Sequence, residues 1–163
     1  MELWDAYDKD FNLIPGITLK REEAASIPDG VYHLVCHILV EHTDGTFLLM
    51  QRDLCKTYPG MWEATAGGSA LKGETAMEAA FRELREETGI VAESLKEIKR
   101  IVDGKKHSVY VFYLCVTGCD KDSVVLQEGE TIAYRWLEKS DIVVMGDDEL
   151  LSESMRDYIS KLV

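Results

Sequence analysis

Positive charge is scarce in this sequence. Lysine and arginine total 18 against 30 aspartate and glutamate residues, which gives a formal net charge of −12 over 163 residues. So little positive charge leaves no sequence-independent attraction to a nucleic-acid backbone or an anionic membrane surface. We therefore expect neither nucleic acid nor membrane as a partner, and an anionic small molecule would need a cation to mediate its binding.

The sequence also has no long apolar run, no leader-like pattern in its first ten residues and no closely paired cysteines. Its longest uncharged stretches, 30–40 and 108–119, are shorter than the about 20 apolar residues of a membrane span. The first ten residues carry charges of both signs and match neither a secretory signal nor a transit peptide, so we expect a cytoplasmic protein. The four cysteines form no C-x-x-C pair, which favours reduced, mostly buried thiols over a disulfide framework.

Length and composition indicate one folded domain of mixed α and β structure. With 46% hydrophobic residues and three prolines, a chain of this size can bury about 68–70% of its unfolded surface around a single core. Residues 33–40 and 46–52 are predicted strands joined at the dipeptide 44–45, an Asp-Gly turn typical of antiparallel hairpins. Further strands are predicted at 97–102, 108–116 and 131–137. The sheet is therefore expected to be mixed or antiparallel.

Two segments carry helical signals. The Thr-Ala-Met-Glu sequence at 75–78 is a capping box, and Gly89 suits a left-handed C-terminal cap, so a helix is predicted between them. Residues 147–162 place Leu151, Met155, Tyr158 and Leu162 along one face. This second predicted helix is expected to pack on the sheet.

The first predicted helix carries three carboxylates on one face. At about 100° per residue, Glu83, Glu86 and Glu87 share an arc of about 100°. Like charges at these spacings oppose helix formation by about 0.2–0.5 kcal/mol per pair, and the C-terminal end of a helix disfavours them further. A hard cation such as Mg²⁺ or Mn²⁺ would offset that cost, whereas a solvated acidic face is the alternative. The same wheel places Met77, Ala80, Phe81 and Leu84 in the core, and Arg82 toward solvent.

A glycine-rich loop feeds directly into this helix. Gly67 and Gly68 would let backbone N–H groups approach phosphate oxygens closely. From Gly68 the sequence runs five residues to Glu74 and seven more to the segment 82–90, Arg-Glu-Leu-Arg-Glu-Glu-Thr-Gly-Ile. This pattern resembles the Nudix box, Gx5Ex7REUxEExGU with U a bulky aliphatic residue, at every specified position.

The resemblance to the Nudix family implies an α/β/α sandwich around a mixed sheet, with residues 1–163 as a single domain and 1–30 as an N-terminal extension packed on it. It implies Mg²⁺-dependent hydrolysis, with Mn²⁺ as an alternative ion, of a diphosphate linkage in a nucleoside diphosphate derivative or a related soluble metabolite. The metal ligands would be Glu83, Glu86 and Glu87. Arg82 would orient these carboxylates, and Glu74 would brace the loop. The general base is either a box glutamate or an acid of a later loop, for which Glu128 and Glu130 are the candidates.

A narrower resemblance concerns the isopentenyl-diphosphate isomerase branch of the family, and it rests on residues 2–5, 32–33, 52–56 and 58–62. It makes Arg52 and Lys56 candidate contacts for the substrate diphosphate; two exposed cations are the alternative. The isomerase cysteine, however, aligns with Gly67, and its metal-binding histidine aligns with Ser69. We therefore favour a hydrolase, with an isomerase and a catalytically idle nucleotide-binding module as alternatives. The oligomeric state is left open, a homodimer included.

Two histidines belong to the first predicted strand. His33 and His37 share a face of that strand, but four residues separate them by about 13 Å, too far to hold one ion together. They are predicted to be packed or cleft-wall histidines.

Overall fold

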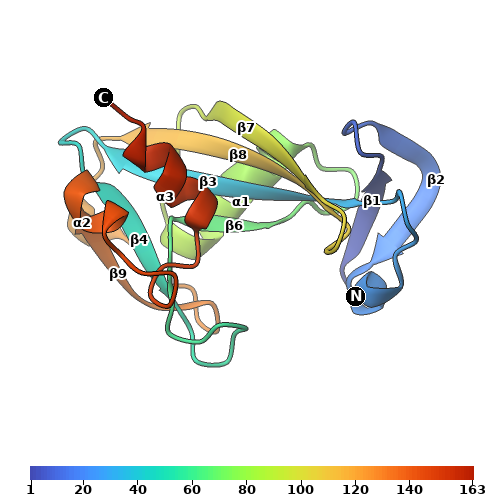
Figure 1. Cartoon of the computed structure of the whole chain (residues 1–163), viewed down its shortest axis with the longest axis horizontal. Helices are drawn as coiled ribbons and strands as arrows, with labels where there is room; N and C mark the ends of the chain where they lie inside the picture. Colours follow the sequence, from blue (N-terminus) through green and yellow to red (C-terminus); the bar gives the residue numbers. More distant parts are fainter.

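The chain folds into a mixed β-sheet with helices on both faces and a separate two-stranded hairpin at the N-terminus (Figure 1). This computed structural model describes residues 1–163. In chain order the elements are β1 (Leu3–Tyr7), β2 (Leu13–Lys20), the 3-10 helix η1 (Arg21–Ser26), β3 (His33–His42), β4 (Phe47–Arg52), β5 (Trp62–Glu63), β6 (Ala66–Ser69), α1 (Ala76–Thr88), β7 (Lys96–Asp103), β8 (Ser108–Thr117), η2 (Lys121–Ser123), β9 (Thr131–Leu137), α2 (Lys139–Val143) and α3 (Glu153–Ser160). The layers agree with the predicted α/β/α sandwich.

The sheet is organised around β3. This strand pairs in parallel with β8 from His33 to His42, and its opposite edge pairs antiparallel with β6. Outside β8 lies β7, while β4 pairs with β5 and β9. One face of the sheet packs against α1, and the other packs against α2 and α3. The sheet is therefore mixed.

The turn at 44–45 forms as predicted, but the strands that it joins pair only at Glu41 and Phe47. Most of the free edge of β3 is taken by β6, and β4 instead pairs along its length with β9. Between β3 and β4 lies the buried hydroxyl of Thr65, which donates to the carbonyl of Leu48 at 2.6 Å. The predicted antiparallel pair is therefore confirmed, but it is confined to the residues beside the turn, because the local sequence determines the turn and distant strands determine the pairing along the rest of each strand.

Both predicted ends of α1 are observed. The Thr75 side chain accepts the Glu78 N–H at 3.2 Å, the Glu78 carboxylate accepts the Thr75 N–H at 2.8 Å, and Gly89 has a φ of 74°. The buried face of the helix is rotated toward the glutamates, so that it includes Ala79 as well as the predicted Ala80 and Leu84. This rotation leaves Met77, which was predicted in the core, 36% exposed.

The C-terminal helix is shorter than the predicted 147–162, since α3 begins only at Glu153. Before it, the Trp62 backbone donates to the Glu149 carbonyl and accepts from the Leu151 N–H, both at 2.9 Å. Pairing with β5 therefore replaces the first helical turns. Of the predicted apolar stripe, Met155 is the residue that is fully buried. None of the helices combines the length and the apolar character that a membrane crossing requires.

The N-terminal hairpin of β1 and β2 has a small core of its own, formed by Trp4, Ala6, Leu19 and Ile27. It lies at one end of the molecule, and reciprocal backbone bonds between Tyr7 and Tyr32, at 2.8 and 2.9 Å, join it to the start of β3 (Figure 1). This placement brings residues 1–30 against the cavity described below.

All four cysteines are free thiols. Cys36 and Cys115 are buried, Cys119 is partly buried, and Cys55 is exposed. This agrees with the expected reduced, mostly buried thiols.

Two truncations on α1 test which of its faces packs in the core. Leu84 is fully buried, so Leu84→Ala should lower the free energy of unfolding by about 2–5 kcal/mol. Met77→Ala, on the partly exposed side of the helix, should cost less than about 1 kcal/mol. Urea denaturation of both variants measures the difference, and equal losses would contradict the observed orientation of α1.

Candidate active site

A cavity of about 1020 Å³ extends from the C-terminal half of α1 to the N-terminal hairpin and the start of α3. Its lining includes nine of the predicted site residues, namely Arg52, Lys56, Gly67, Gly68, Arg82, Glu83, Glu86, Glu87 and Glu130. Glu128, the other candidate base, is exposed and does not line the cavity. Residues that are distant in the sequence are thus brought to one concave surface.

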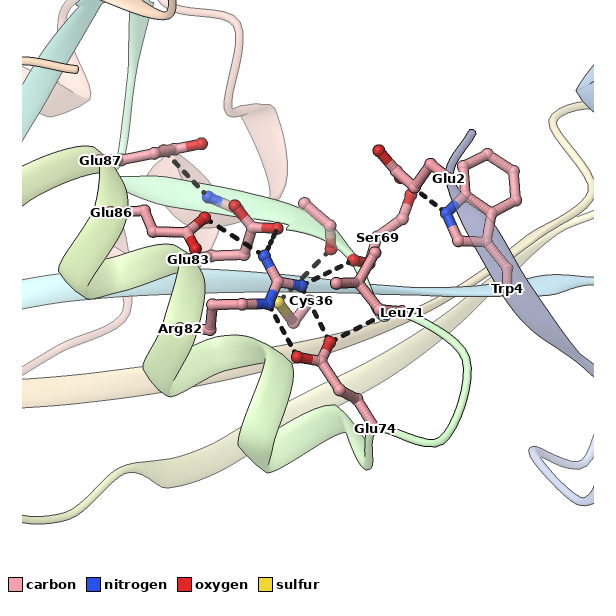
Figure 2. A network of polar contacts seen from close by, with 12 residues as sticks. Glu2, Trp4, Cys36, Ser69, Leu71, Glu74, Arg82, Glu83, Glu86 and Glu87 are labelled. Carbon is pink, nitrogen blue, oxygen red and sulfur yellow. Dashed lines mark hydrogen bonds and ion pairs between the residues drawn. The ribbon is translucent and has the colours of Figure 1, made fainter. Parts of the chain in front are cut away.

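The three glutamates of α1, labelled in Figure 2, all line this cavity, and they are buried to different extents. Glu87 is 8% exposed, whereas the side chains of Glu83 and Glu86 are 14% and 42% exposed. Burial raises the pKa of Glu83, although Arg82 acts in the opposite direction. Burial also raises the pKa of Glu87 well above its usual value, and the charge of Glu83 raises it further. Ionising these acids in the metal-free protein is therefore costly.

Arg82 lies inside the site. Its guanidinium donates to both oxygens of Glu74 at 2.8 and 2.9 Å, to the Ser69 carbonyl at 3.1 Å, to Glu83 at 2.6 Å and to Glu86 at 3.4 Å. Figure 2 shows it between Glu74 on one side and the two cavity glutamates on the other. The wheel-based prediction of a solvent-facing Arg82 is wrong, because the loop between β6 and α1 covers that side of the helix and supplies acceptors.

The three glutamates share the cavity without converging on a point. No three His, Cys, Asp or Glu side chains lie close enough together to hold a metal ion. Glu83 and Glu86 share Arg82, whereas Glu87 accepts only the Gly67 N–H, at 3.3 Å, and has no cationic partner. Such oxygen donors are those that Mg²⁺ and Mn²⁺ prefer, and a cation would relieve the repulsion between them. The donor chemistry of these carboxylates therefore fits a hard divalent ion, although their side chains would have to turn toward one another to hold it.

Gly67 and Gly68 are needed for the close approach of β6 to the glutamates of α1 and to the neighbouring strand β3. A Cβ on Gly68 would lie 2.4 Å from Oε1 of Glu83, and one on Gly67 would lie 2.6 Å from both the Cys36 carbonyl oxygen and Nδ1 of His37. Neither glycine has a positive φ, so the requirement is space and not backbone conformation. Strand β6 can thus run directly beside the acids of α1.

The two cations predicted to contact phosphate are already paired with acids. Arg52 forms an ion pair with Glu63 and also donates to the Thr57 carbonyl at 2.7 Å, while Lys56 forms an ion pair with Glu130. The Arg52 and Lys56 side chains are 18% and 23% exposed, so the alternative of two exposed cations is wrong. A candidate phosphate contact and a candidate base are therefore bonded to each other.

Aromatic rings form part of the cavity wall. His37 stacks on Tyr110 and Phe112, with ring centroids at 5.5 and 5.2 Å. Burial lowers the pKa of His37 to about 4, so its ring is neutral at pH 7. His33 also lines the cavity and stacks on Trp4 at 4.2 Å. The prediction of packed, cleft-wall histidines is confirmed for both.

Sequence reasoning missed Glu63 and three residues of the N-terminal segment 1–30 that also line the cavity, which are Glu2, Trp4 and Arg21. None of them belongs to a spaced motif, and the residues of the N-terminal segment reach the cavity only because that segment folds back against β3. No pattern in the sequence signals that contact.

Comparison with known proteins assigns the family. The model of the NUDIX domain family matches residues 31–162, which cover β3 to α3 and the whole cavity wall except the lining residues of the N-terminal segment 1–30. The chain belongs to the Nudix family.

Related sequences carry different descriptions. An uncharacterized Nudix hydrolase of Listeria monocytogenes is 38% identical over 92 residues, which are 56% of this chain and 53% of that protein. The chain thus spans about half the length of the Listeria relatives that it matches. An isopentenyl-diphosphate Delta-isomerase of Photobacterium profundum is 31% identical over 132 residues, 75% of this chain and 73% of the relative.

A solved structure resembles nearly the whole chain. The crystal structure of a Deinococcus radiodurans protein has a TM-score of 0.74 and covers 98% of both chains at 16% sequence identity. The likeness therefore extends over the N-terminal hairpin, and it concerns the fold alone.

Glu87→Gln tests whether this carboxylate is electrostatically costly without a cation. An acid whose pKa is raised on folding holds its proton more tightly when folded, so stability should fall as pH rises above its usual value of 4.5. In EDTA at pH 8, Glu87→Gln should therefore raise the melting temperature by about 2–5 °C, and the gain should vanish near pH 4.5. Differential scanning calorimetry across pH measures both effects. The exposed Glu93→Gln is the control, and a destabilised Glu87→Gln at pH 8 would contradict the argument.

Proposed function

We propose that this protein is a Mg²⁺-dependent hydrolase that cleaves a diphosphate linkage in a nucleoside diphosphate derivative or a related small metabolite. The observation that carries the proposal is Glu87, a buried carboxylate without a cationic partner, which lies in one cavity with the other acids of a complete Nudix box. The net charge of −12 further supports a small-molecule substrate over a nucleic acid.

Glu83, Glu86 and Glu87 would hold the ion, and Mn²⁺ could take the place of Mg²⁺. When bound, the ion supplies charge neutralisation at the phosphate oxygens and a more acidic water. Arg82 keeps two of the carboxylates oriented, and the bare backbone at Gly67 and Gly68 leaves room beside them.

Arg52 and Lys56 can exchange their ion pairs with acids for contacts with the substrate phosphates. A diphosphate in the cavity competes with Glu63 for Arg52 and with Glu130 for Lys56, because all four side chains line the same space. When Lys56 turns to a phosphate oxygen, Glu130 is left without its cation and is free to accept a proton from the attacking water. Glu130 is therefore our candidate for the general base.

A ring-bearing substrate suits this cavity better than a branched hydrocarbon chain. The acids of α1 and the stacked rings of His37, Tyr110 and Phe112 line the same cavity. Flat aromatic surfaces favour stacking with planar groups. The neutral His37 ring has no hydrogen-bond partner in the protein, so it can bond to the edge of a heterocycle.

Isomerisation of isopentenyl diphosphate is the second candidate function, favoured by the similarity to the Photobacterium isomerase. It is weakened by Gly67 and Ser69, which stand where the isomerase cysteine and histidine align. A catalytically idle binding module is a third candidate, but a binder has no need of the complete set of box acids.

The deciding experiment is a substrate panel in ¹⁸O-labelled water with Mg²⁺ or Mn²⁺. The panel contains nucleoside triphosphates, sugar nucleotides, dinucleotides and isoprenoid diphosphates. We expect hydrolysis of a nucleotide-type compound and no allylic product from isopentenyl diphosphate, with the label identifying the attacked phosphorus. Conversion of isopentenyl diphosphate to its isomer would favour the isomerase, and tight nucleotide binding without turnover would favour the idle module.

Glu86→Gln should lower kcat for the hydrolysed compound at least about 100-fold, because it removes one charged metal ligand without changing the size of the side chain. Steady-state kinetics at saturating Mg²⁺ measures the loss. Glu93→Gln, on the exposed segment after α1, should match the wild type. Activity of Glu86→Gln within about tenfold of the wild type would show that the metal role is wrong.

Gly68→Ala should weaken Mn²⁺ binding at least about tenfold, because the added methyl group would occupy the position of the Glu83 carboxylate. Isothermal titration calorimetry with Mn²⁺ alone measures this without a substrate. Gly104→Ala is the matched control, since a Cβ there meets no atom within 4 Å. Unchanged Mn²⁺ affinity in Gly68→Ala would argue against Glu83 as a ligand.

A further inference from the structure

The N-terminal hairpin is bonded to the loop that leads into the Nudix helix. The Lys72 N–H donates to the Leu3 carbonyl at 2.8 Å, and the Gly73 N–H donates to the Asp5 carboxylate at 2.7 Å. The Lys72 ammonium also donates to the Thr18 hydroxyl at 2.8 Å. All three bonds end one or two residues before Glu74. Residues of the N-terminal hairpin, which precede the family match at residue 31, thus hold the loop that carries Glu74. Glu74 is the ion-pair partner of Arg82.

A second connection runs through a stacked pair of rings. Trp4 is 4% exposed and lies on the His33 ring with a centroid distance of 4.2 Å and an interplanar angle of 15°. Its indole N–H donates to Glu2 at 2.7 Å, and the other oxygen of Glu2 accepts from Arg21 at 2.8 Å. The indole is therefore fixed at its edge and at its face, as the right side of Figure 2 shows for Glu2 and Trp4.

The hydrogen bonds of His33 define its tautomer. Burial lowers its pKa to about 4, so at pH 7 the ring has one N–H donor and one acceptor nitrogen. The Ser108 hydroxyl donates to the Lys106 carbonyl at 3.0 Å, so it accepts from Nε2–H of His33 at 2.7 Å. Nδ1 is then the acceptor for the Ser69 hydroxyl at 3.3 Å.

Ser69 completes the connection to the acids. It is the last residue of β6, and its carbonyl oxygen accepts from Nη2 of Arg82 at 3.1 Å. Trp4 therefore contacts a ring that bonds to Ser69, and Asp5 bonds to the loop ahead of Glu74. The contacts of Trp4 thus lead to the Ser69 carbonyl and those of Asp5 lead to Glu74, and both groups accept hydrogen bonds from Arg82. Arg82 in turn donates to Glu83 and Glu86.

We propose that the N-terminal hairpin is a positioning element of the active site, in which Trp4 and Asp5 hold the loop from Ser69 to Glu74 so that Arg82 keeps the box glutamates in place. The family match begins at residue 31, after this hairpin. The inference depends on the proposed hydrolase function for its kinetic readout only, because the position of Arg82 can be measured without any substrate.

The test compares Trp4→Leu, Trp4→Phe and Asp5→Ala with the wild type. The control is Glu23→Gln, which breaks the exposed ion pair with Lys20 on the same N-terminal segment. The first readout is the Nε–H signal of Arg82 in ¹H–¹⁵N spectra of the metal-free proteins. The second is steady-state kinetics on the compound hydrolysed in the panel, and thermal unfolding confirms that each variant is folded.

Trp4→Leu and Asp5→Ala should each shift the Arg82 signal and lower kcat about tenfold or more, with KM changed less than about threefold, because misplaced catalytic groups mainly affect the transition state. Trp4→Phe keeps an aromatic ring on His33 and should restore kcat to within about threefold of the wild type. Glu23→Gln should alter neither readout.

An unmoved Arg82 signal in a folded Trp4→Leu or Asp5→Ala protein would overturn the proposal, as would Trp4→Phe being as impaired as Trp4→Leu. If Trp4→Leu does not fold, Asp5→Ala decides by the same criteria. Should no panel compound be hydrolysed, the proposed function fails while the NMR comparison still decides this inference.

Discussion

Arg82 brings one positive charge into a cluster of acids, and the arrangement of the site depends on it. Its guanidinium uses its donors on Glu74, Glu83, Glu86 and the Ser69 carbonyl, so a single rigid group links the loop before α1 to the last turns of that helix. A guanidinium offers several donors in a fixed plane and stays charged, which a lysine would not reproduce. The acids are thereby held near one another despite their mutual repulsion.

The charge compensation by Arg82 does not extend to Glu87. Arg82 neutralises part of the charge of Glu83 and Glu86, but the most buried acid of the helix has no such partner, and the nearby Glu83, Glu63 and Glu130 all disfavour its ionisation. A protein rarely keeps a buried carboxylate in this state without a cation or a proton. The electrostatic imbalance is local, and it lies at the point where the cavity is lined by the backbone of Gly67.

Local sequence signals predicted the local structure well. The capping box at Thr75, the left-handed glycine at Gly89 and the spacing of the box acids depend on interactions within a few residues, and all of them are found in α1. The pairing of strands was less predictable. The Asp-Gly turn formed without its full hairpin, and the start of the C-terminal helix gave way to pairing with Trp62, because distant backbone competed for the same hydrogen bonds.

By itself the sequence determined the residue types that carry the chemistry, their spacing, and hence the family, since the motif from Gly68 to Ile90 is contiguous and one helix presents most of it. Only the tertiary structure decided that Arg82 turns inward, that Lys56 binds Glu130, and that the N-terminal hairpin forms a wall of the cavity. Each of these depends on contacts between segments far apart in the chain. Packing of the whole molecule creates such contacts, and no local pattern encodes them.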